Sequence, residues 1–214
     1  MLENLRQEVW EANVSLPKNH LVTMHSGNAS GRDPETGLVC IKPSGIDYDR
    51  LKPEDLVIID TEGKIVEGKL NPSVDTSIHL FLYKEKPEWG GIIHTHSNYA
   101  TSFAALGKSI PAYLSAIADE FGEEIPCTRY APNTDNEIGQ AILEKVNSSP
   151  AILLKNHGVF TFGKRPKDAL KAAIMVEDVA KTVHLALLLG NPDILPKSEV
   201  EKWWNRYHGT YGQK

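Results

Sequence analysis

Apolar side chains recur at helical spacing from the start of the chain. The apolar positions of the first segment, three or four residues apart, are Leu2, Leu5, Val9 and Ala12. They share one face of an α-helix, so the pattern predicts an amphipathic helix over residues 2–15. Further helices are expected over residues 73–84, 98–106, 135–147 and 165–190, with a last one that opens at residues 198–201. Ser73 and the capping box from Ser198 to Glu201 are the expected helix starts, and Gly190 is the expected end of the long helix.

Short apolar runs between these helices predict strands. Residues 37–42 form one such run, and residues 56–60 and 64–68 flank a Thr-Glu-Gly turn and predict a β-hairpin. Two further buried strands are expected over residues 90–97 and 151–163, both of which contain histidine. Strands and helices are interspersed, without a repeat, a low-complexity tract or a linker. The sequence therefore predicts an α/β fold and one domain that spans residues 1–214.

Composition limits the class of protein and its partners. The 214 residues are 41% hydrophobic and 24% charged, which is typical of a soluble globular domain. A net charge of −5 argues against nucleic acid or an anionic membrane surface as the main partner. No apolar run approaches the ~18 residues of a membrane span, and the N-terminus lacks the apolar segment of a signal peptide. Cys40 and Cys127 form no spaced pair, so we expect neither a disulfide scaffold nor a thiolate metal site, and a cytoplasmic location.

The strongest local signal is the segment His94-Thr95-His96. Side chains two apart on a strand point to one face, so both imidazoles can reach one ion while Thr95 points away. His157, in the other apolar run, is the candidate for a third ligand in a site that leaves one position open for substrate. Two histidines at this spacing are weak evidence alone, because hydrogen-bonded core histidines give the same pattern. That alternative does not explain why an apolar run ends in two of them.

Several turn residues are suited to a phosphate group. Gly27-Asn28 and Ser44-Gly45 lie beside small residues that expose backbone N–H groups, and Lys42 would supply a positive charge. Taken singly, each is an ordinary turn residue. No glycine-rich nucleotide motif is present, so a nucleotide is not implied.

Two carboxylates and the remaining histidines complete the candidates. Asp75 lies in the first turn of the helix expected at 73–84, where its ordinary role is to stabilise the helix dipole. Asp119 follows an apolar stretch, where its ordinary role is a turn or a cap. His25 lies in an expected loop and is a candidate to line the site. His79 and His184 fall inside helices and are interpreted as ordinary surface or packing residues.

These segments together carry a resemblance that runs nearly from end to end. The matching segments are Leu16 to Thr23, Ser26 to Asn28, Ile41 to Gly45, Asp47-Tyr48, Pro72 to Thr76, Gly91 to Ser97, Ile125 to Arg129, Asn156 to Gly158 and Tyr211 to Gln213. In this order they make the chain similar to the L-ribulose-5-phosphate 4-epimerases, within the wider class II aldolase superfamily that includes L-fuculose-phosphate aldolase. The resemblance implies a central, mainly antiparallel sheet with helices on both faces. It also implies a cyclic homotetramer whose active sites lie at subunit interfaces and receive the neighbour's C-terminal tail.

The resemblance further implies a role for each candidate position. The residues that match the metal site, with Zn²⁺ as cofactor and Mn²⁺ or Co²⁺ as alternatives, are His94, His96, His157 and, beside or on the metal, Asp75. The residues that match the substrate and phosphate pocket are Gly27, Asn28, Lys42, Ser44, Gly45, Ser73 and Val74, of which Val74 replaces a second serine. The residues that match the acid/base pair are Asp119 and Tyr211, and His208 matches a histidine of the same tail.

The implied reaction is the interconversion of L-ribulose 5-phosphate and D-xylulose 5-phosphate. C4 of the sugar carries no acidic proton, because its neighbour is a carbinol. Inversion therefore requires cleavage and re-formation of the C3–C4 bond, with a proton-handling group on each face. Asp75 favours an epimerase, since the aldolases of the family have Glu after the Pro-Ser motif. An Asp at position 119 is likewise a feature of the epimerases. The alternatives are an aldolase that releases its aldehyde, an epimerase for a related ketose phosphate, and a non-catalytic metal or sugar-phosphate binding module.

Overall fold

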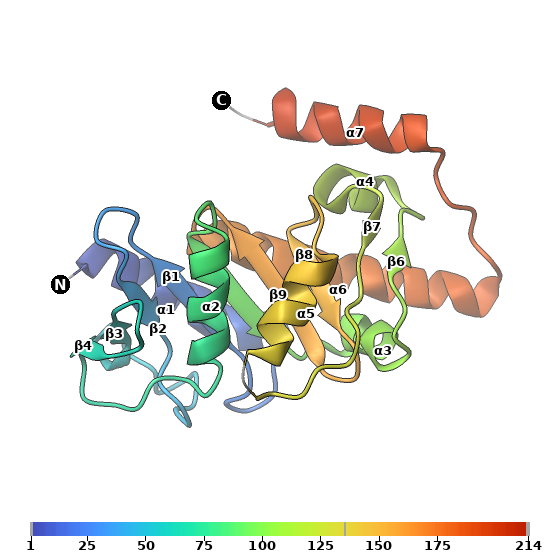
Figure 1. Ribbon diagram of the computed structural model, residues 1–214. Helices are drawn as coiled ribbons and strands as arrows, with labels where there is room; N and C mark the ends of the chain where they lie inside the picture. The colour runs from blue at the N-terminus through green and yellow to red at the C-terminus, as the bar shows by residue number, and fades with distance from the viewer. Residues whose placement is uncertain (1, 135, 213–214) are drawn as a thin grey trace.

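The apolar runs of the chain pair into a central β-sheet, and helices cover both faces of this sheet (Figure 1). The computed structural model describes residues 2–134 and 136–212. The strands are β1 (Asn28–Arg32), β2 (Val39–Ile41), β3 (Val57–Ile59), β4 (Ile65–Glu67), β5 (Gly91–Thr95), β6 (Ile110–Pro111), β7 (Glu124–Ile125), β8 (Ala151–Leu154) and β9 (Gly158–Gly163). The helices are α1 (Glu3–Lys18), α2 (Thr76–Glu85), α3 (Asn98–Ala105), α4 (Ser115–Phe121), α5 (Glu137–Lys145), α6 (Pro166–Leu189) and α7 (Lys197–Gly209), with a short 3₁₀ helix, η1 (Pro53–Asp55).

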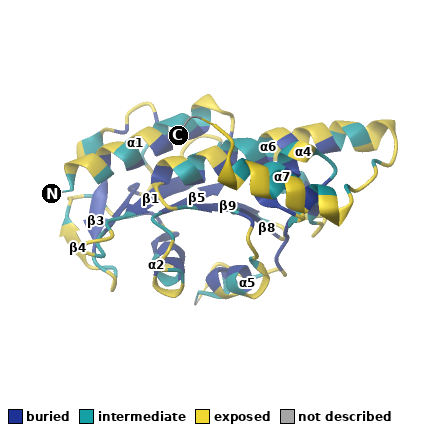
Figure 2. Ribbon diagram, turned by 90° about the horizontal axis from the view of Figure 1, so that it is seen from above, coloured by how far each residue is buried: buried dark blue, intermediate teal, exposed yellow. Residues whose placement is uncertain are grey.

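All neighbouring strands of the central sheet are antiparallel. In the described part of the chain this sheet has seven strands in the order β4-β3-β2-β1-β5-β9-β8, and β6 pairs with β7 in a separate two-stranded sheet. Figure 2 shows α1 and α6 on one face of the central sheet and α2 and α5 on the other. The expected α/β class, with an antiparallel sheet between two layers of helices, is confirmed.

Apolar clusters lie on both faces of the sheet, which explains why strands β3 and β8 are apolar throughout rather than alternating. All five residues of β5 are buried. On one face, Ile78 of α2 packs in a cluster with Phe160 of β9. On the other, Leu16 of α1 and Ala173 of α6 pack with Ile93 of β5. None of the described helices combines the length and apolarity needed to cross a membrane.

Three glycines stand in register across β1, β5 and β9. Gly31 pairs with Gly91, and Gly91 pairs with Gly163. A Cβ atom on Gly91 would lie 2.5 Å from the backbone of Arg165, and one on Gly163 would lie 2.5 Å from the backbone nitrogen of Ala169. This glycine row therefore lets the start of α6 rest directly on the sheet.

The structure differs from the sequence pattern where turns interrupt or replace the apolar runs. Residues 151–163 form two strands rather than one, joined by a tight turn in which Asn156 has a φ of +61°. His157 lies in this turn and not on a strand. Residues 28–32 form the central strand β1, which small side chains conceal from a search for apolar alternation. The α4 helix and the β6–β7 pair were likewise not predicted from the sequence.

Neither serine that was expected to begin a helix does so. α2 begins at Thr76 with Asp75 as its N-cap residue, and the Thr76 hydroxyl donates to the carbonyl of Ser73. α7 begins at Lys197, one residue before Ser198, and no side chain caps it. The Ser73 hydroxyl instead accepts a hydrogen bond from a side chain of β1, which belongs to the site described next.

Candidate active site

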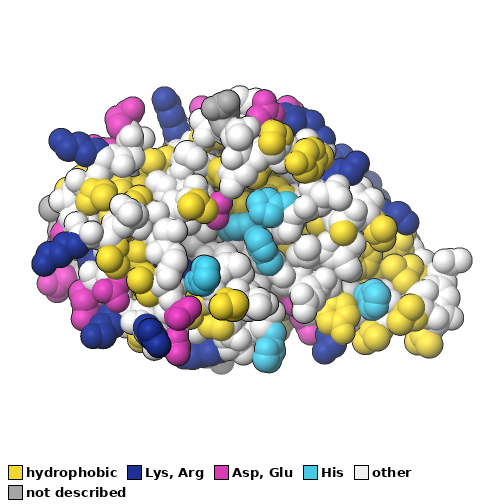
Figure 3. Space-filling model, turned by 90° about the horizontal axis from the view of Figure 1, so that it is seen from below, with side chains coloured by type: hydrophobic (Ala, Val, Ile, Leu, Met, Phe, Trp, Pro, Cys, Tyr) yellow, Lys and Arg dark blue, Asp and Glu magenta, His cyan; other side chains and the backbone are white. Residues whose placement is uncertain are grey.

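A pocket of about 270 Å³ lies at the end of the sheet where β1 begins and β5 ends. Figure 3 shows histidine side chains gathered around a hollow near the middle of the face seen from below. The residues that line the pocket are His25, Ser26, Gly27, Asn28, Lys42, Pro43, Ser44, Gly45, Ser73, Val74, Asp75, His94, His96, Asn133 and His157. Segments far apart in the sequence therefore meet here, and they include the candidate metal and phosphate residues.

Three histidines converge in the pocket, each with one ring nitrogen within 4.8 Å of those of the others. His94 is the penultimate residue of the buried strand β5, His96 follows the last residue of this strand, and His157 comes from the β8–β9 turn. The His94 Nδ1 atom lies 3.0 Å from the carbonyl oxygen of Val159, which can only accept, so we assign the proton to Nδ1. This leaves the lone pair of His94 on Nε2, which lies 2.9 Å from Nε2 of His96.

Burial keeps these imidazoles neutral. It lowers the pKa of His94, His96 and His157 below the ordinary value, and Asp75 only partly opposes the effect. Neutral imidazoles offer lone pairs, which is the state that a metal ion requires. Gly158 makes the convergence possible, because a Cβ atom there would lie 2.5 Å from the carbonyl oxygen of Thr95, 3.1 Å from the His96 ring and 3.2 Å from the His94 ring.

Asp75 reaches the pocket from the start of α2. Its Oδ2 atom accepts a hydrogen bond of 2.7 Å from Nδ2 of Asn28, and the same amide nitrogen lies 3.1 Å from the Ser73 hydroxyl oxygen. Asn28 stands opposite His94 in the β1–β5 pair, so strand register brings the acid beside the histidines. Burial acts to raise the pKa of Asp75, but His94, His79 and the Asn28 hydrogen bond lower it below the usual range. The carboxyl group is therefore ionised at neutral pH.

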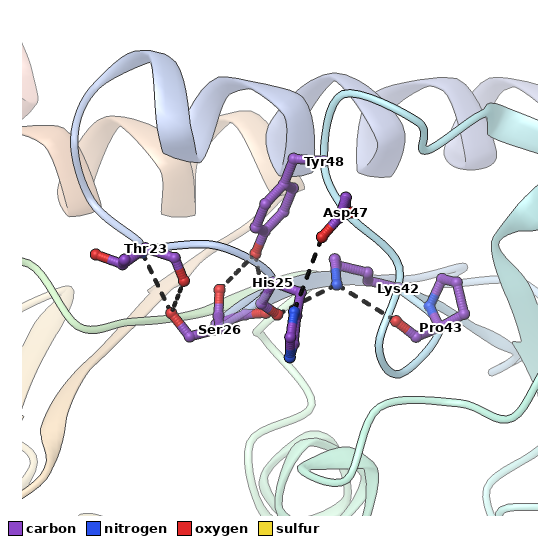
Figure 4. Close-up of polar contacts among 8 residues, drawn as sticks. Thr23, His25, Ser26, Lys42, Pro43, Asp47 and Tyr48 are labelled. Atoms are coloured by element: carbon purple, nitrogen blue, oxygen red, sulfur yellow. Dashed lines mark hydrogen bonds and ion pairs between the residues drawn. The ribbon is translucent and has the colours of Figure 1, made fainter.

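The Lys42 ammonium group lies at the other side of the pocket, and Figure 4 shows its surroundings. The residue is 2% exposed. Its Nζ atom lies 3.4 Å from the carbonyl oxygens of His25 and Pro43 and 4.7 Å from the centre of the Tyr48 ring, whose hydroxyl donates to backbone carbonyls. Lys42 makes no ion pair with any described residue. Burial lowers its pKa to about 8, against the opposing charge of Asp47, so this site provides a cation that no described carboxylate contacts directly.

Backbone N–H groups complete the environment of Lys42. Gly45 has a φ of +70°, a conformation that favours glycine in a turn. The N–H groups of Gly45 and Val74 donate to no other described residue, and both residues line the pocket. Free N–H groups in a turn and just before a helix attract anions. Val74, 76% exposed, presents its backbone there without a hydroxyl.

The structure does not bring the other three predicted site residues into this pocket. Asp119 lies on α4, His208 lies near the end of α7 and Tyr211 follows it. In Figure 1, α4 and α7 lie at the upper end of the molecule, whereas α2 begins at the lower end, which holds the pocket. Asp119 Oδ2 lies 4.0 Å from Nη2 of Arg206, and the Arg206 guanidinium lies 5.1 Å from the centre of the Tyr211 ring. Asp119 and Tyr211 thus gather around one arginine, away from the histidines.

Sequence reasoning assigned no role to three residues that line the pocket, Ser26, Pro43 and Asn133. Nδ2 of Asn133 lies 3.5 Å from Oδ1 of Asp75, the oxygen that Asn28 leaves free. The loop that carries Asn133 has no apolar periodicity and no spaced motif, so only its path in the fold reveals this contact. His25, the loop candidate, does line the pocket.

Known proteins are similar to this chain in sequence and in fold. The family model described as "Class II Aldolase and Adducin N-terminal domain" matches residues 7–184. The L-ribulose-5-phosphate 4-epimerase UlaF of Salmonella paratyphi A is 40% identical over 233 aligned residues, and that of Salmonella paratyphi C is 41% identical; both alignments cover 100% of either chain. Among solved structures, an L-fuculose 1-phosphate aldolase has a TM-score of 0.87 and 32% identity, with 96% of both chains covered. The L-fuculose-1-phosphate aldolase of Thermus thermophilus has a TM-score of 0.73 and 25% identity, with 88% of this chain and 98% of that chain covered.

Proposed function

Since the chain belongs to the class II aldolase family, we propose that it is an L-ribulose-5-phosphate 4-epimerase that uses Zn²⁺ to interconvert L-ribulose 5-phosphate and D-xylulose 5-phosphate. One observation carries the proposal: a single pocket contains both a cluster of three neutral imidazoles and a buried ammonium group that pairs with no described carboxylate. A phosphorylated ketose needs both, because its carbonyl end requires an electrophile and its phosphate end requires a cation. The full-length similarity to curated epimerases supports the choice of sugar.

The histidine cluster fits a divalent metal. Three imidazole nitrogens with a position left open for substrate form a donor set found in catalytic Zn²⁺ sites. The hydrogen bond from Nδ1 of His94 to Val159 fixes the tautomer that presents Nε2 to the ion, as an outer partner of a metal ligand commonly does. His94, His96 and His157 would hold the metal, with Asp75 beside it. The bound metal supplies a Lewis acid that stabilises negative charge on the sugar oxygens; Mn²⁺ or Co²⁺ are the alternatives.

The phosphate end of the pocket has a task of its own in this reaction. Cleavage of the C3–C4 bond leaves the phosphate on the two-carbon fragment, glycolaldehyde phosphate. Lys42 and the free N–H groups of Gly45 and Val74 hold this fragment while its aldehyde turns and presents the opposite face. Asn28, Ser44 and the remaining pocket residues line the path of the sugar. Retention of the fragment is what separates an epimerase from an aldolase.

Proton transfer is assigned here to residues from outside the pocket of one chain. We assign it to Asp119 and Tyr211, one for each face of C4, with His208 in the same tail. These residues do not line the pocket of their own chain, which supports a homotetramer in which a second copy brings them to the pocket. A reducing, cytoplasmic location agrees with Cys40 and Cys127, which are buried and unpaired.

A second candidate is an aldolase that releases its aldehyde. The similarity in fold to an L-fuculose 1-phosphate aldolase favours it. Asp75 and Asp119 favour the epimerase, as the sequence indicates. With L-ribulose 5-phosphate as substrate, the two functions differ in the fate of the two-carbon phosphorylated fragment, so a product analysis separates them.

The test is a turnover assay on the purified, Zn²⁺-loaded protein. L-Ribulose 5-phosphate should yield D-xylulose 5-phosphate without free glycolaldehyde phosphate. Accumulation of dihydroxyacetone and glycolaldehyde phosphate would establish the aldolase instead. Binding of the ketose phosphate by calorimetry, with no product formed from it or from other pentulose and deoxyhexulose phosphates, would show a non-catalytic binding module.

A further inference from the structure

A row of polar side chains joins β1 to α2 inside the apolar layer between them. Nδ2 of Asn28 donates to Oδ2 of Asp75 at 2.7 Å. Two residues further along β1, the Ser30 hydroxyl oxygen lies 2.7 Å from Nδ1 of His79 and 2.8 Å from the hydroxyl oxygen of Tyr83. All five residues are buried, in a cluster region that is otherwise Ile, Leu, Val and Phe. Such a row inside an apolar layer requires a reason, because each polar group must be paired to be buried.

The spacing of the two elements explains how the row forms. Alternate residues of a strand lie roughly 6.6–6.8 Å apart on one face. One turn of a helix advances about 5.4 Å, so residues four apart are about 6 Å apart on one side. Asn28 and Ser30 are two apart on β1, whereas Asp75 and His79 are four apart along the start and first turn of α2. The first bond is in the pocket, and the second lies one turn behind it.

His79 occupies a particular place in this row. Its side chain is fully buried, and its Nε2 atom has no hydrogen-bond partner among the described residues. Its ring lies 5.5 Å from that of Phe160, and the Phe160 ring stacks on His94 at 4.7 Å and 26°. Its backbone N–H donates to the carbonyl oxygen of Asp75. His79 therefore contacts the backbone of Asp75 directly, and through the Phe160 ring it is linked to His94.

We propose that His79 is a positioning residue that fixes the start of α2 against β1, and so places Asp75 beside the metal-site histidines and the Val74 N–H group at the phosphate end of the pocket. The proposal rests on the proposed function only in that it takes this pocket as the active site. A helix held by apolar contacts alone can slide, since Ile, Leu and Val surfaces are not directional. Hydrogen bonds are directional, and the Ser30–His79 bond is the one nearest the pocket that involves no substrate or metal group.

The experiment compares variants on either side of Ser30 in the full-length protein. His79→Leu removes the bond nearest the pocket, and His79→Asn keeps a polar atom near the position of Nδ1. Tyr83→Phe is the matched control, because it removes one buried hydrogen bond to the same Ser30 oxygen, one helical turn further from the pocket. Ser30→Ala serves if His79→Leu does not fold. For each variant we would measure Tm, Zn²⁺ affinity by competition with a chelator, binding of inorganic phosphate by calorimetry, and kcat and KM.

Residues that orient metal-site groups typically change metal affinity or activity by roughly 10–100-fold when replaced. His79→Leu should weaken Zn²⁺ binding and lower kcat/KM within this range, and His79→Asn should recover part of the loss. Tyr83→Phe should lower Tm by a similar amount yet keep Zn²⁺ affinity and kcat/KM within about threefold of wild type, as expected for a change whose effect is only structural. Equal functional losses at equal losses of Tm, or wild-type values in His79→Leu, would overturn the proposal. Zn²⁺ and phosphate binding are measured without a sugar, so a wild-type protein inactive on L-ribulose 5-phosphate would refute the proposed function and leave this test intact.

Discussion

Replacement of Lys42 by Met removes the positive charge of the pocket and keeps most of its volume. The Lys42 ammonium has two long contacts to carbonyl oxygens and one to an aromatic ring, and no carboxylate of the described chain pairs with it. A bound phosphate would be its only strong partner. A hydrogen bond to a charged group contributes about 1.5–3 kcal/mol, which corresponds to a KM for the ketose phosphate roughly 10- to 150-fold higher in Lys42→Met. The kcat value should change much less, because the phosphate is held equally before and during bond cleavage.

The lowered pKa of Lys42 gives the same prediction a pH signature. The protonated form binds phosphate, and burial lowers the pKa of Lys42 to about 8. In wild type kcat/KM should therefore fall as pH rises above about 8, and Lys42→Met should lack this fall. The unfolded chain, with the ordinary pKa of 10.5, binds more protons than the folded one between these two values. Folding stability attributable to Lys42 is thus lost as pH falls through that window, so Lys42→Met should have a higher Tm than wild type at pH 7.

The assay is steady-state epimerisation of L-ribulose 5-phosphate between pH 6.5 and 9.5 by roughly half-unit steps, with calorimetric Tm at the same pH values, a range that spans the pKa of the buried ammonium. Lys64→Met is the matched control, because Lys64 is exposed in the β3–β4 hairpin and does not line the pocket. An unchanged KM in Lys42→Met would place the phosphate elsewhere. A Tm at pH 7 below that of wild type would show that the ammonium stabilises the fold and would refute the electrostatic reasoning.

The other predictions test the metal, the proton carriers and the assembly. Replacement of any one of His94, His96 and His157 by alanine should remove most of about one bound divalent ion per chain; elemental analysis that finds full occupancy in all three variants would exclude the site. Asp119→Asn and Tyr211→Phe should each slow epimerisation by roughly 10²–10⁴-fold without loss of metal, and a wild-type rate would remove that residue from the mechanism. A chain that ends at residue 205 should bind metal but turn over poorly, and light scattering should show wild type as a tetramer. An active wild-type monomer would contradict a shared site.

The sequence predicts the convergence of the candidate histidines because strand periodicity is a short-range rule. His94 in β5 and His96, the residue after its end, need only the alternation of side chains along an extended chain to share a face. His157 joins them as predicted but from a turn, since Asn156 takes a left-handed conformation and Gly158 allows the rings to converge. The sequence therefore identifies the three histidines. The turn that brings His157 to the other two depends on the conformation of Asn156 and the missing side chain of Gly158, which the sequence pattern does not predict.

Other features depend on contacts that no local pattern encodes. Ser73 has the composition of a helix cap, but its hydroxyl oxygen accepts from Asn28 and from the backbone of Asp75, so the helix begins later. The search for apolar runs misses β1, because its buried residues include the small residues alanine, serine and glycine. The family resemblance assigns a chemical role to Tyr211 but not a position, and in the single chain this residue lies beside Arg206 of α7 and does not line the pocket. Neighbours that are distant in the sequence decide these cases.

The glycine row across β1, β5 and β9 means that substitutions in three segments far apart in the sequence disturb the same contact, the packing of α6 on the sheet. Room for one methyl group at Gly91 or Gly163 requires α6 to rise from the sheet, because the obstacle is helix backbone rather than a side chain that can rotate. No single compensating substitution supplies that movement. A complete library of point variants, selected for growth or folding, should therefore show a line of forbidden positions that crosses the strands at right angles. Single substitutions can therefore accumulate in the loops of the pocket, whereas a substitution at Gly91 or Gly163 requires a simultaneous shift of α6.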